Sequence, residues 1–385
     1  ITFKPTIFDD RIYMLQNEYR LENDKSSFIA DFGYTKGYQS KLSNNRNGMS
    51  HLFSKLNIDL DFEKFNESKL DFFLEKVSMD TYLSIFDGVL LTDKTFEEDI
   101  KDHSTLTSGF KLALDHNDFT FNGGMYAYES LQTKSNNDRF EYVLPYYDFS
   151  TTLISNDKWT LGLSSNGKNV LSKTNQLKSS VTNNINYTSN NFVSSFGFVN
   201  NIGVYLRNSN FLGKNIPNYR SSPRSEILNI YELKSELPLI KEGNNTTEFI
   251  TPKVSFRINP SDMKDYNGNK SIITTDNVFS IDRYGFSDSF ETGKSLTIGM
   301  DYRRERKNDK DKYLEFKLAN IIRDTAEYKI PRSSSAQGKM SNIFGSIENK
   351  FSDNIKFDYN FSLDNNLKNF EYSDFSTEIS INNFV

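Results

Sequence analysis

The chain has 385 residues, a formal net charge of -5 and no cysteine. The missing cysteines exclude disulfide frameworks and thiolate metal sites. The acidic balance, with basic residues spread along the chain, argues against nucleic-acid binding. Three histidines lie far apart with no metal-binding spacing, and no nucleophile elbow, P-loop or dinucleotide fingerprint is present, so neither a cofactor nor an enzymatic activity is expected.

Alternation of apolar and polar residues recurs along the chain, and each run predicts a half-buried β-strand. The clearest runs, in chain order, are residues 28–35, 56–63, 70–74, 110–114, 119–121, 159–163, 296–302, 314–318 and 355–363. With the weaker runs included, we expect about 14 to 16 strands, with boundaries uncertain by a few residues.

The connections between these runs are rich in Asn, Asp, Ser, Lys and Gly, residues that favour turns. Long polar loops alternate with shorter turns, which is typical of outer-membrane barrels. A basic run lies at the start of one predicted connection, Arg304–Lys312. The run consists of Arg303, Arg304, Arg306 and Lys307. A solvated charge run is the expected interpretation, and contact with lipid phosphate is the alternative.

Aromatic residues make up 14% of the chain, although only 36% of it is hydrophobic. A membrane barrel combines these features because one face meets lipid, aromatic girdles mark the interfaces and the lumen is polar. No apolar run approaches the roughly 20 residues of a transmembrane helix, which excludes helical spans only. Alternation alone also fits a soluble sandwich. Strand length and aromatic content favour an all-β fold, an antiparallel transmembrane β-barrel.

Residues 355–363 show what a barrel implies for each side chain. The odd positions are apolar and the even positions are polar, so the strand has one face of each kind. In a barrel the apolar face meets lipid. The side chains predicted to line the lumen are Lys356, Asp358, Asn360 and Ser362.

Proline is scarce, and Pro5 lies inside the strand-like opening segment 1–7. A proline cannot donate a hydrogen bond to a sheet, so it occurs at sheet edges, strand starts or bulges. The residues alone leave two interpretations open, a strand-end proline or a deliberately weakened seam.

Several segments together resemble the LptD family of outer-membrane lipopolysaccharide-assembly proteins. They are the opening ITFKPTIFDDRIYMLQNEYRLEN, then FEYVLPYYDFS, ELKSELPLIKEGNNTTEFITPKVSFRINP, TTDNVFSIDRYGFSDSFETGKSLTIGMDYR and FDYNFSLDNN. In the fourth segment, the residues that match the order of a family motif are Asn277, Phe279, Arg283, Asp288, Glu291, Gly293, Gly299 and Tyr302. The resemblance implies that these motif residues have structural roles.

This resemblance implies a translocon for lipopolysaccharide in the outer membrane of a Gram-negative bacterium. Lipopolysaccharide would arrive from periplasmic Lpt bridge proteins through a jelly-roll domain and pass into the outer leaflet by a lateral opening in the barrel. An LptE-like lipoprotein plug would occupy the lumen, and outer-membrane lipids would surround the wall. Pro5 matches a family proline near the opening, which favours the weakened-seam interpretation.

We expect residues 1–385 to be an internal piece of a larger barrel domain, with the jelly roll and the closing strands outside the chain. A general porin, complete in about 16–18 strands, or another barrel transporter is the main alternative. A secreted sandwich or solenoid is a third, but it predicts a fixed repeat that the sequence does not show.

Overall fold

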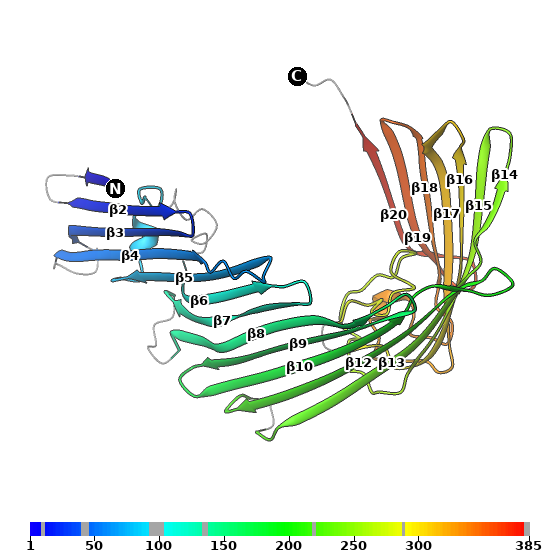
Figure 1. Ribbon diagram of the computed structural model, residues 1–385, viewed down its shortest axis with the longest axis horizontal. Helices are drawn as coiled ribbons and strands as arrows, with labels where there is room; N and C mark the ends of the chain where they lie inside the picture. The colour runs from blue at the N-terminus through cyan, green and yellow to red at the C-terminus, as the bar shows by residue number, and fades with distance from the viewer. Residues whose placement is uncertain are drawn as a thin grey trace. The chain divides into compact units, whose positions relative to one another are not determined.

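The computed structural model describes residues 1–8, 12–39, 46–91, 104–132, 138–217, 221–286 and 289–380. Within these ranges, 20 strands belong to one sheet (Figure 1), and the strand pairs of known register are all antiparallel. The predicted class, an antiparallel β-barrel of which the chain supplies a part, is confirmed. Among the described residues, no helix is long and apolar enough to cross a membrane.

The first ten strands lead from the N-terminus to the middle of the chain. They are β1 (Thr2–Ile7), β2 (Tyr13–Asn23), β3 (Ser26–Gln39), β4 (Arg46–Asp59), β5 (Glu67–Val77), β6 (Thr105–Asp115), β7 (Phe119–Ser130), β8 (Phe140–Ser155), β9 (Trp159–Ser172) and β10 (Gln176–Ser189). The other ten are β11 (Phe192–Val193), β12 (Val199–Lys214), β13 (Arg224–Glu236), β14 (Leu239–Glu242), β15 (Thr246–Asn259), β16 (Gly293–Arg306), β17 (Asp309–Arg323), β18 (Ile343–Ser352), β19 (Ile355–Leu363) and β20 (Phe370–Ile379). The described residues also form a four-residue helix, α1 (Tyr82–Ile85), and a 3-10 turn, η1 (Arg332–Ser334).

The described residues form two compact units. Unit 1 contains residues 1–153, 163–184 and 208–226, and unit 2 contains residues 154–162, 185–207 and 227–385. Several strands contribute to both units, and each unit is considered by itself below.

Each unit has both short turns and long connections, and the longest connections lie at one edge of its strands. In unit 1, the turns 24–25 and 116–118 lie at one edge of the antiparallel strands, and the long connection 78–104 lies at the other. In unit 2, the turns 307–308 and 353–354 contrast in the same way with the connections 260–292 and 324–342. Sharply unequal edges of this kind are characteristic of outer-membrane barrels.

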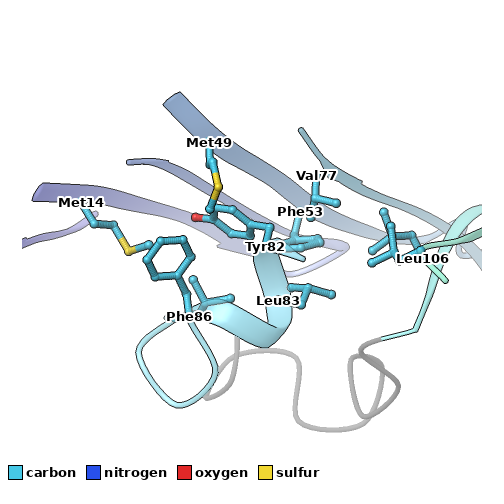
Figure 2. Close-up of a cluster of buried hydrophobic side chains, with 10 residues drawn as sticks. Met14, Met49, Phe53, Val77, Tyr82, Leu83, Phe86 and Leu106 are labelled. Atoms are coloured by element: carbon cyan, nitrogen blue, oxygen red, sulfur yellow. The ribbon is translucent and has the colours of Figure 1, made fainter. Parts of the chain in front are cut away.

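The core of unit 1 lies between one face of the sheet and residues 78–91, the described part of the β5–β6 connection, which we call the strap. Figure 2 shows α1 of the strap with Tyr82, Leu83 and Phe86 directed toward side chains of the strands. The strand residues of this buried cluster are Met14, Met49, Phe53, Val77 and Leu106. Burial of this apolar surface fixes the strap, because four helical residues have little stability alone.

The core of unit 2 lies under the connection between β15 and β16, residues 260–292, which we call the large insert. Its side chains Met263, Ile273, Val278 and Phe286 are buried against the sheet and against the β17–β18 connection. The sheet contributes Ala319, Ile321 and Phe344 to this cluster.

The structure has more strands than the 14 to 16 expected. β10 is rich in Asn and Ser and has few apolar residues, so it lacks the regular alternation that marks a strand in the sequence. The predicted connection at residues 304–312 is wrong, because β16 continues through Arg306 and β17 begins at Asp309. Long strands of this kind draw stability from paired neighbours on both sides rather than from their own composition.

Candidate functional site

The two faces of the sheet in unit 2 have opposite chemistry. On β15, β16 and β17, the register aligns Val254 with Ile298, and Met300 with Leu318, on one face. The apolar side chains of this face stay exposed, as Ile298 shows with 46% of its surface accessible. The other face is polar and covered, and Arg257 on it is only 4% accessible. A soluble protein places these groups the other way round.

Unit 1 shows the same inversion. On β3, Phe32 and Tyr34 point to the face that remains exposed, and on β2 Leu15 does so opposite Tyr34. The alternate positions Gln16 and Asp31 are fully buried beneath the strap. An exposed apolar face of this kind, with the covered polar face on the other side, is typical of a sheet that contacts lipid.

The large insert is built on two of the motif residues that the sequence singles out. Asn277 accepts a hydrogen bond from the Thr274 backbone N–H through Oδ1 at 2.9 Å and donates from Nδ2 to the Ile272 carbonyl at 3.0 Å. Phe279 packs against Gly299 of β16, where a Cβ atom would lie 2.8 Å from the ring. Glycine at position 299 therefore lets the insert approach the strand.

A buried ionic hub, formed by Arg257, Arg283, Glu291 and Arg323, holds the insert's end. Arg283 donates from Nε to Glu291 Oε2 at 2.6 Å. Arg323 pairs with the other carboxylate oxygen, and Arg257 Nη1 lies 3.6 Å from Oε2. All four side chains are at most 5% accessible. One carboxylate thus connects the insert to β15 and β17, an arrangement that is specific in geometry and costly to break.

The hub is supported by hydrogen bonds to the neighbouring strand and to the insert. Arg283 donates to Thr297 Oγ1 and Ser295 Oγ of β16, each at 3.0 Å. Arg323 donates from Nη2 to the Thr292 carbonyl at 2.7 Å. With the bond to Glu291, every guanidinium nitrogen of Arg283 has a partner, whereas Nε and Nη1 of the buried Arg257 have no hydrogen-bond partner among the described residues.

Next to the hub, burial raises the pKa of the Asp282 carboxyl, although backbone N–H groups of Phe286 and Gly285 oppose the shift by donating to it. Gly293 has a φ of 88° where the insert joins β16, a conformation that favours glycine. The insert therefore depends on local geometry at its exit as well as on the charges.

One described motif residue does not join this assembly. Tyr302 lies on the outward apolar face, opposite Ile250 on β15 and Phe316 on β17. Asp288 falls outside the described residues. The structure therefore brings together Asn277, Phe279, Arg283, Glu291, Gly293 and Gly299 around the large insert.

Beside the large insert, the inward face forms an open pocket of about 410 Å³. Lys253 and Asp301 pair across it at 2.5 Å, and Lys317 lies 3.7 Å from Asp276 of the insert. Its other polar and aromatic lining includes Asn201, Lys234, Glu236, Thr275 and Phe279. Acidic and basic groups alternate, so the pocket has both donors and acceptors for a hydrated or hydroxyl-rich molecule.

The sequence pattern does not indicate Arg257 and Arg323 of the hub, or the polar residues that line the pocket. Arg257 and Arg323 are charged residues in strand segments, and a charge within a predicted membrane strand is a signal of an inward, functional position. The predicted lumen residues of β19 fit the inward face: Asp358 aligns with Glu348, and Ser362 with the buried Phe344.

The basic run also has defined partners. The Arg303 guanidinium lies 3.9 Å from the centre of the Tyr313 ring and 3.6 Å from Glu315. Arg304 points to the opposite face and lies 3.9 Å from Glu248. A cation over an aromatic ring is more ordered than a solvated charge run.

Pro5 lies in β1, opposite Leu15 of β2, and is exposed on the outward face. Pro5 belongs to unit 1, whereas the large insert belongs to unit 2.

A protein-family model described as LptD, LPS transport system D, matches residues 64–385. The match covers the large insert, the ionic hub and the pocket, whereas Pro5 lies before it. No curated protein matches the chain.

Proposed function

The chain belongs to the LptD family, LPS transport system D, and on that premise we propose that it forms part of the outer-membrane wall that inserts lipopolysaccharide into the outer leaflet. The role is transport and includes no catalytic step. Residues 1–385 would be one section of a single barrel domain.

The observation that supports this proposal is the chemistry of the two faces of the sheet: apolar side chains are exposed on one face, and polar side chains are covered on the other. Exposed apolar side chains such as Phe256 and Ile298 would contact outer-membrane lipids, and the covered polar side chains would face the lumen. In each unit, the edge with the long connection, 78–104 in unit 1 and 260–292 in unit 2, would face outward from the cell, because outer-membrane barrels have short periplasmic turns.

The polar inward face supplies what a saccharide and a plug protein need. The pocket beside the large insert combines the ion pair Lys253–Asp301 with the ring of Phe279. Lipopolysaccharide sugars would pass along this face, since each hydroxyl group can both donate and accept hydrogen bonds. An LptE-like lipoprotein plug would pack on the same face, and periplasmic Lpt bridge proteins would deliver the lipopolysaccharide.

The lateral opening would lie at β1. Proline at position 5 removes one backbone hydrogen-bond donor from this strand. The loss would weaken the pairing of β1 and help it separate from a neighbouring strand. The exposed position of Pro5 on the apolar face would place it against the lipid that receives the cargo.

The test replaces Pro5 with valine in the full-length protein and measures the rate at which new lipopolysaccharide reaches the cell surface. Pro252→Val is the matched control, because Pro252 is also an exposed proline within a strand. It lies in β15, opposite Met300 of β16. We expect Pro5→Val to slow arrival several-fold and the control to match the wild type. If the Pro5→Val protein delivers lipopolysaccharide to the surface at the wild-type rate, the proposed opening at β1 is wrong. If depletion of the whole protein leaves that rate unchanged, the proposed transport role is wrong.

A further inference from the structure

The strap, residues 78–91, reaches across the inward face of unit 1 to the first hairpin. Lys4 of β1 donates from Nζ to the Val89 carbonyl at 2.6 Å. Gln16 of β2 donates to the same carbonyl at 3.3 Å and accepts from the Leu91 backbone N–H at 2.9 Å. Lys4 and Gln16 are direct cross-strand partners, so both strands of the hairpin hold one point of the strap.

The middle of the strap is fixed to β3 and β4, the strands that follow the hairpin and that we call the wall. The Tyr82 hydroxyl lies 2.8 Å from His51 Nδ1, and His51 Nε2 lies 3.4 Å from Asp31 Oδ1. All three side chains are buried. Burial raises the pKa of the Tyr82 hydroxyl, which therefore stays protonated and can donate to His51. Glycine at position 33 makes room, since a Cβ there would lie 2.4 Å from the His51 ring.

The start of the strap is tied to strands farther from the hairpin. Asp80 pairs with Arg139 at 2.6 Å, and Arg139 pairs in turn with Glu129 of β7 at 2.7 Å. Apolar packing joins the two ends, because the Phe86 ring lies 5.7 Å from Phe8 beside β1 and is buried with Met14 of β2. The strap thus spans from β1 to β7 on the inward side.

We propose that the strap is an internal latch that holds the β1–β2 hairpin against the wall and must let go of Lys4 and Gln16 before β1 can move. This inference rests on the proposed lateral opening at β1. The two ends of the strap differ in strength. The hairpin end is held by three hydrogen bonds and the packing of Phe86, whereas the wall end combines the larger part of the apolar cluster with the Asp80–Arg139 ion pair.

This asymmetry predicts the order of opening. At the hairpin end, three hydrogen bonds can be exchanged for bonds to water or to an entering polar molecule at small net cost, and the apolar contact to be lost is that of one ring, Phe86. Removing Tyr82 or Leu83 from the cluster would expose apolar surface, which is more costly. The hairpin would therefore leave the strap while the strap stays on the wall, and a sugar entering from inside could compete for the Val89 carbonyl.

The experiment uses the full-length protein in lipid nanodiscs with the variants Lys4→Met and Gln16→Leu. Lys4→Arg restores a cationic donor. Lys25→Met is the control for loss of a lysine in unit 1, because Lys25 pairs with Asp61 at 2.7 Å in exposed connections and does not contact the strap. Backbone hydrogen exchange is followed in β1 and β2, with β15–β18 as an internal reference. The rate at which lipopolysaccharide reaches the surface is measured in cells that carry each variant.

We expect Lys4→Met and Gln16→Leu to speed exchange in β1–β2 by about tenfold, as loss of one or two hydrogen bonds allows. Exchange in β15–β18 should not change, and Lys4→Arg and Lys25→Met should resemble the wild type. Lipopolysaccharide arrival should rise with β1–β2 exchange. Unchanged exchange in β1–β2 would overturn the latch, and faster exchange with unchanged arrival would overturn its role in opening. Neither result bears on the Pro5 test of the opening itself.

Discussion

The strap in unit 1 and the large insert in unit 2 both cover an inward polar face, but they are anchored by different chemistry. The strap is held mainly by apolar side chains around Tyr82 and Leu83. The large insert adds to its apolar cluster a buried carboxylate, Glu291, that pairs with arginines from three segments. Apolar packing is non-directional and tolerates small shifts, whereas the ionic hub allows one geometry. The comparison indicates that the hairpin in unit 1 can separate from its cover, whereas the cover in unit 2 is held in one geometry.

The largest expected effect comes from Glu291→Gln in the full-length protein. The substitution leaves three buried guanidinium groups without their carboxylate, which should lower the free energy of unfolding by about 4 kcal/mol. Reversible denaturation in detergent micelles measures the change. Glu242→Gln is the control, because Glu242 is exposed and pairs with Lys307 at 3.2 Å, and it should cost less than about 1 kcal/mol. Equal effects of the two variants would show that the hub does not anchor the insert.

The next effect tests the apolar anchor of the strap. Leu83 is 1% accessible and belongs to the buried cluster, so Leu83→Ala should lower the free energy of unfolding by about 3 kcal/mol through lost burial and a residual cavity. The control is Leu367→Ala in the exposed β19–β20 turn, at 62% accessibility. Hydrogen exchange should rise in β2–β6 only. A loss of protection across β15–β18 as well would contradict separate anchoring of the two covers.

The smallest effect concerns close approach of the large insert to β16. In Gly299→Ala, the new Cβ would meet the Phe279 ring and the Leu318 carbonyl, each at 2.8 Å. Such overpacking should cost about 2 kcal/mol. Gly203→Ala is the matched control, since the nearest atoms to its Cβ lie at 3.9 Å. A thermal melt of each variant gives the comparison, and a Gly299→Ala protein as stable as Gly203→Ala would mean that Phe279 is free to move away.

The strands and their two faces could be predicted from the sequence because a strand's periodicity is a local property. Residues 355–363 alternate, and β19 is found there with Asp358 and Asn360 aligned with inward residues of β18. Strands such as β10 could not be found in this way, because the hydrogen bonds of their neighbours, rather than their own composition, stabilise them.

The candidate site could be predicted only in part. Arg283 and Glu291 stand close in sequence and are also together in space, at 2.6 Å. Their partners Arg257 and Arg323 come from strands on either side of the insert, and no local pattern connects them. Tyr302 belongs to the same sequence motif but lies on the outward face of β16, because successive side chains of a strand point to opposite faces.

The sequence by itself determined that the chain is built of antiparallel strands, that each strand has an apolar and a polar face, and that both long and short connections join them. These features depend on side-chain period and turn chemistry within a few residues. Only the tertiary structure decided that Lys4 meets Val89 and that one carboxylate joins three arginines. Such contacts join segments far apart in the chain, and their geometry is set by strand register and by the fold of the connections over the inward face.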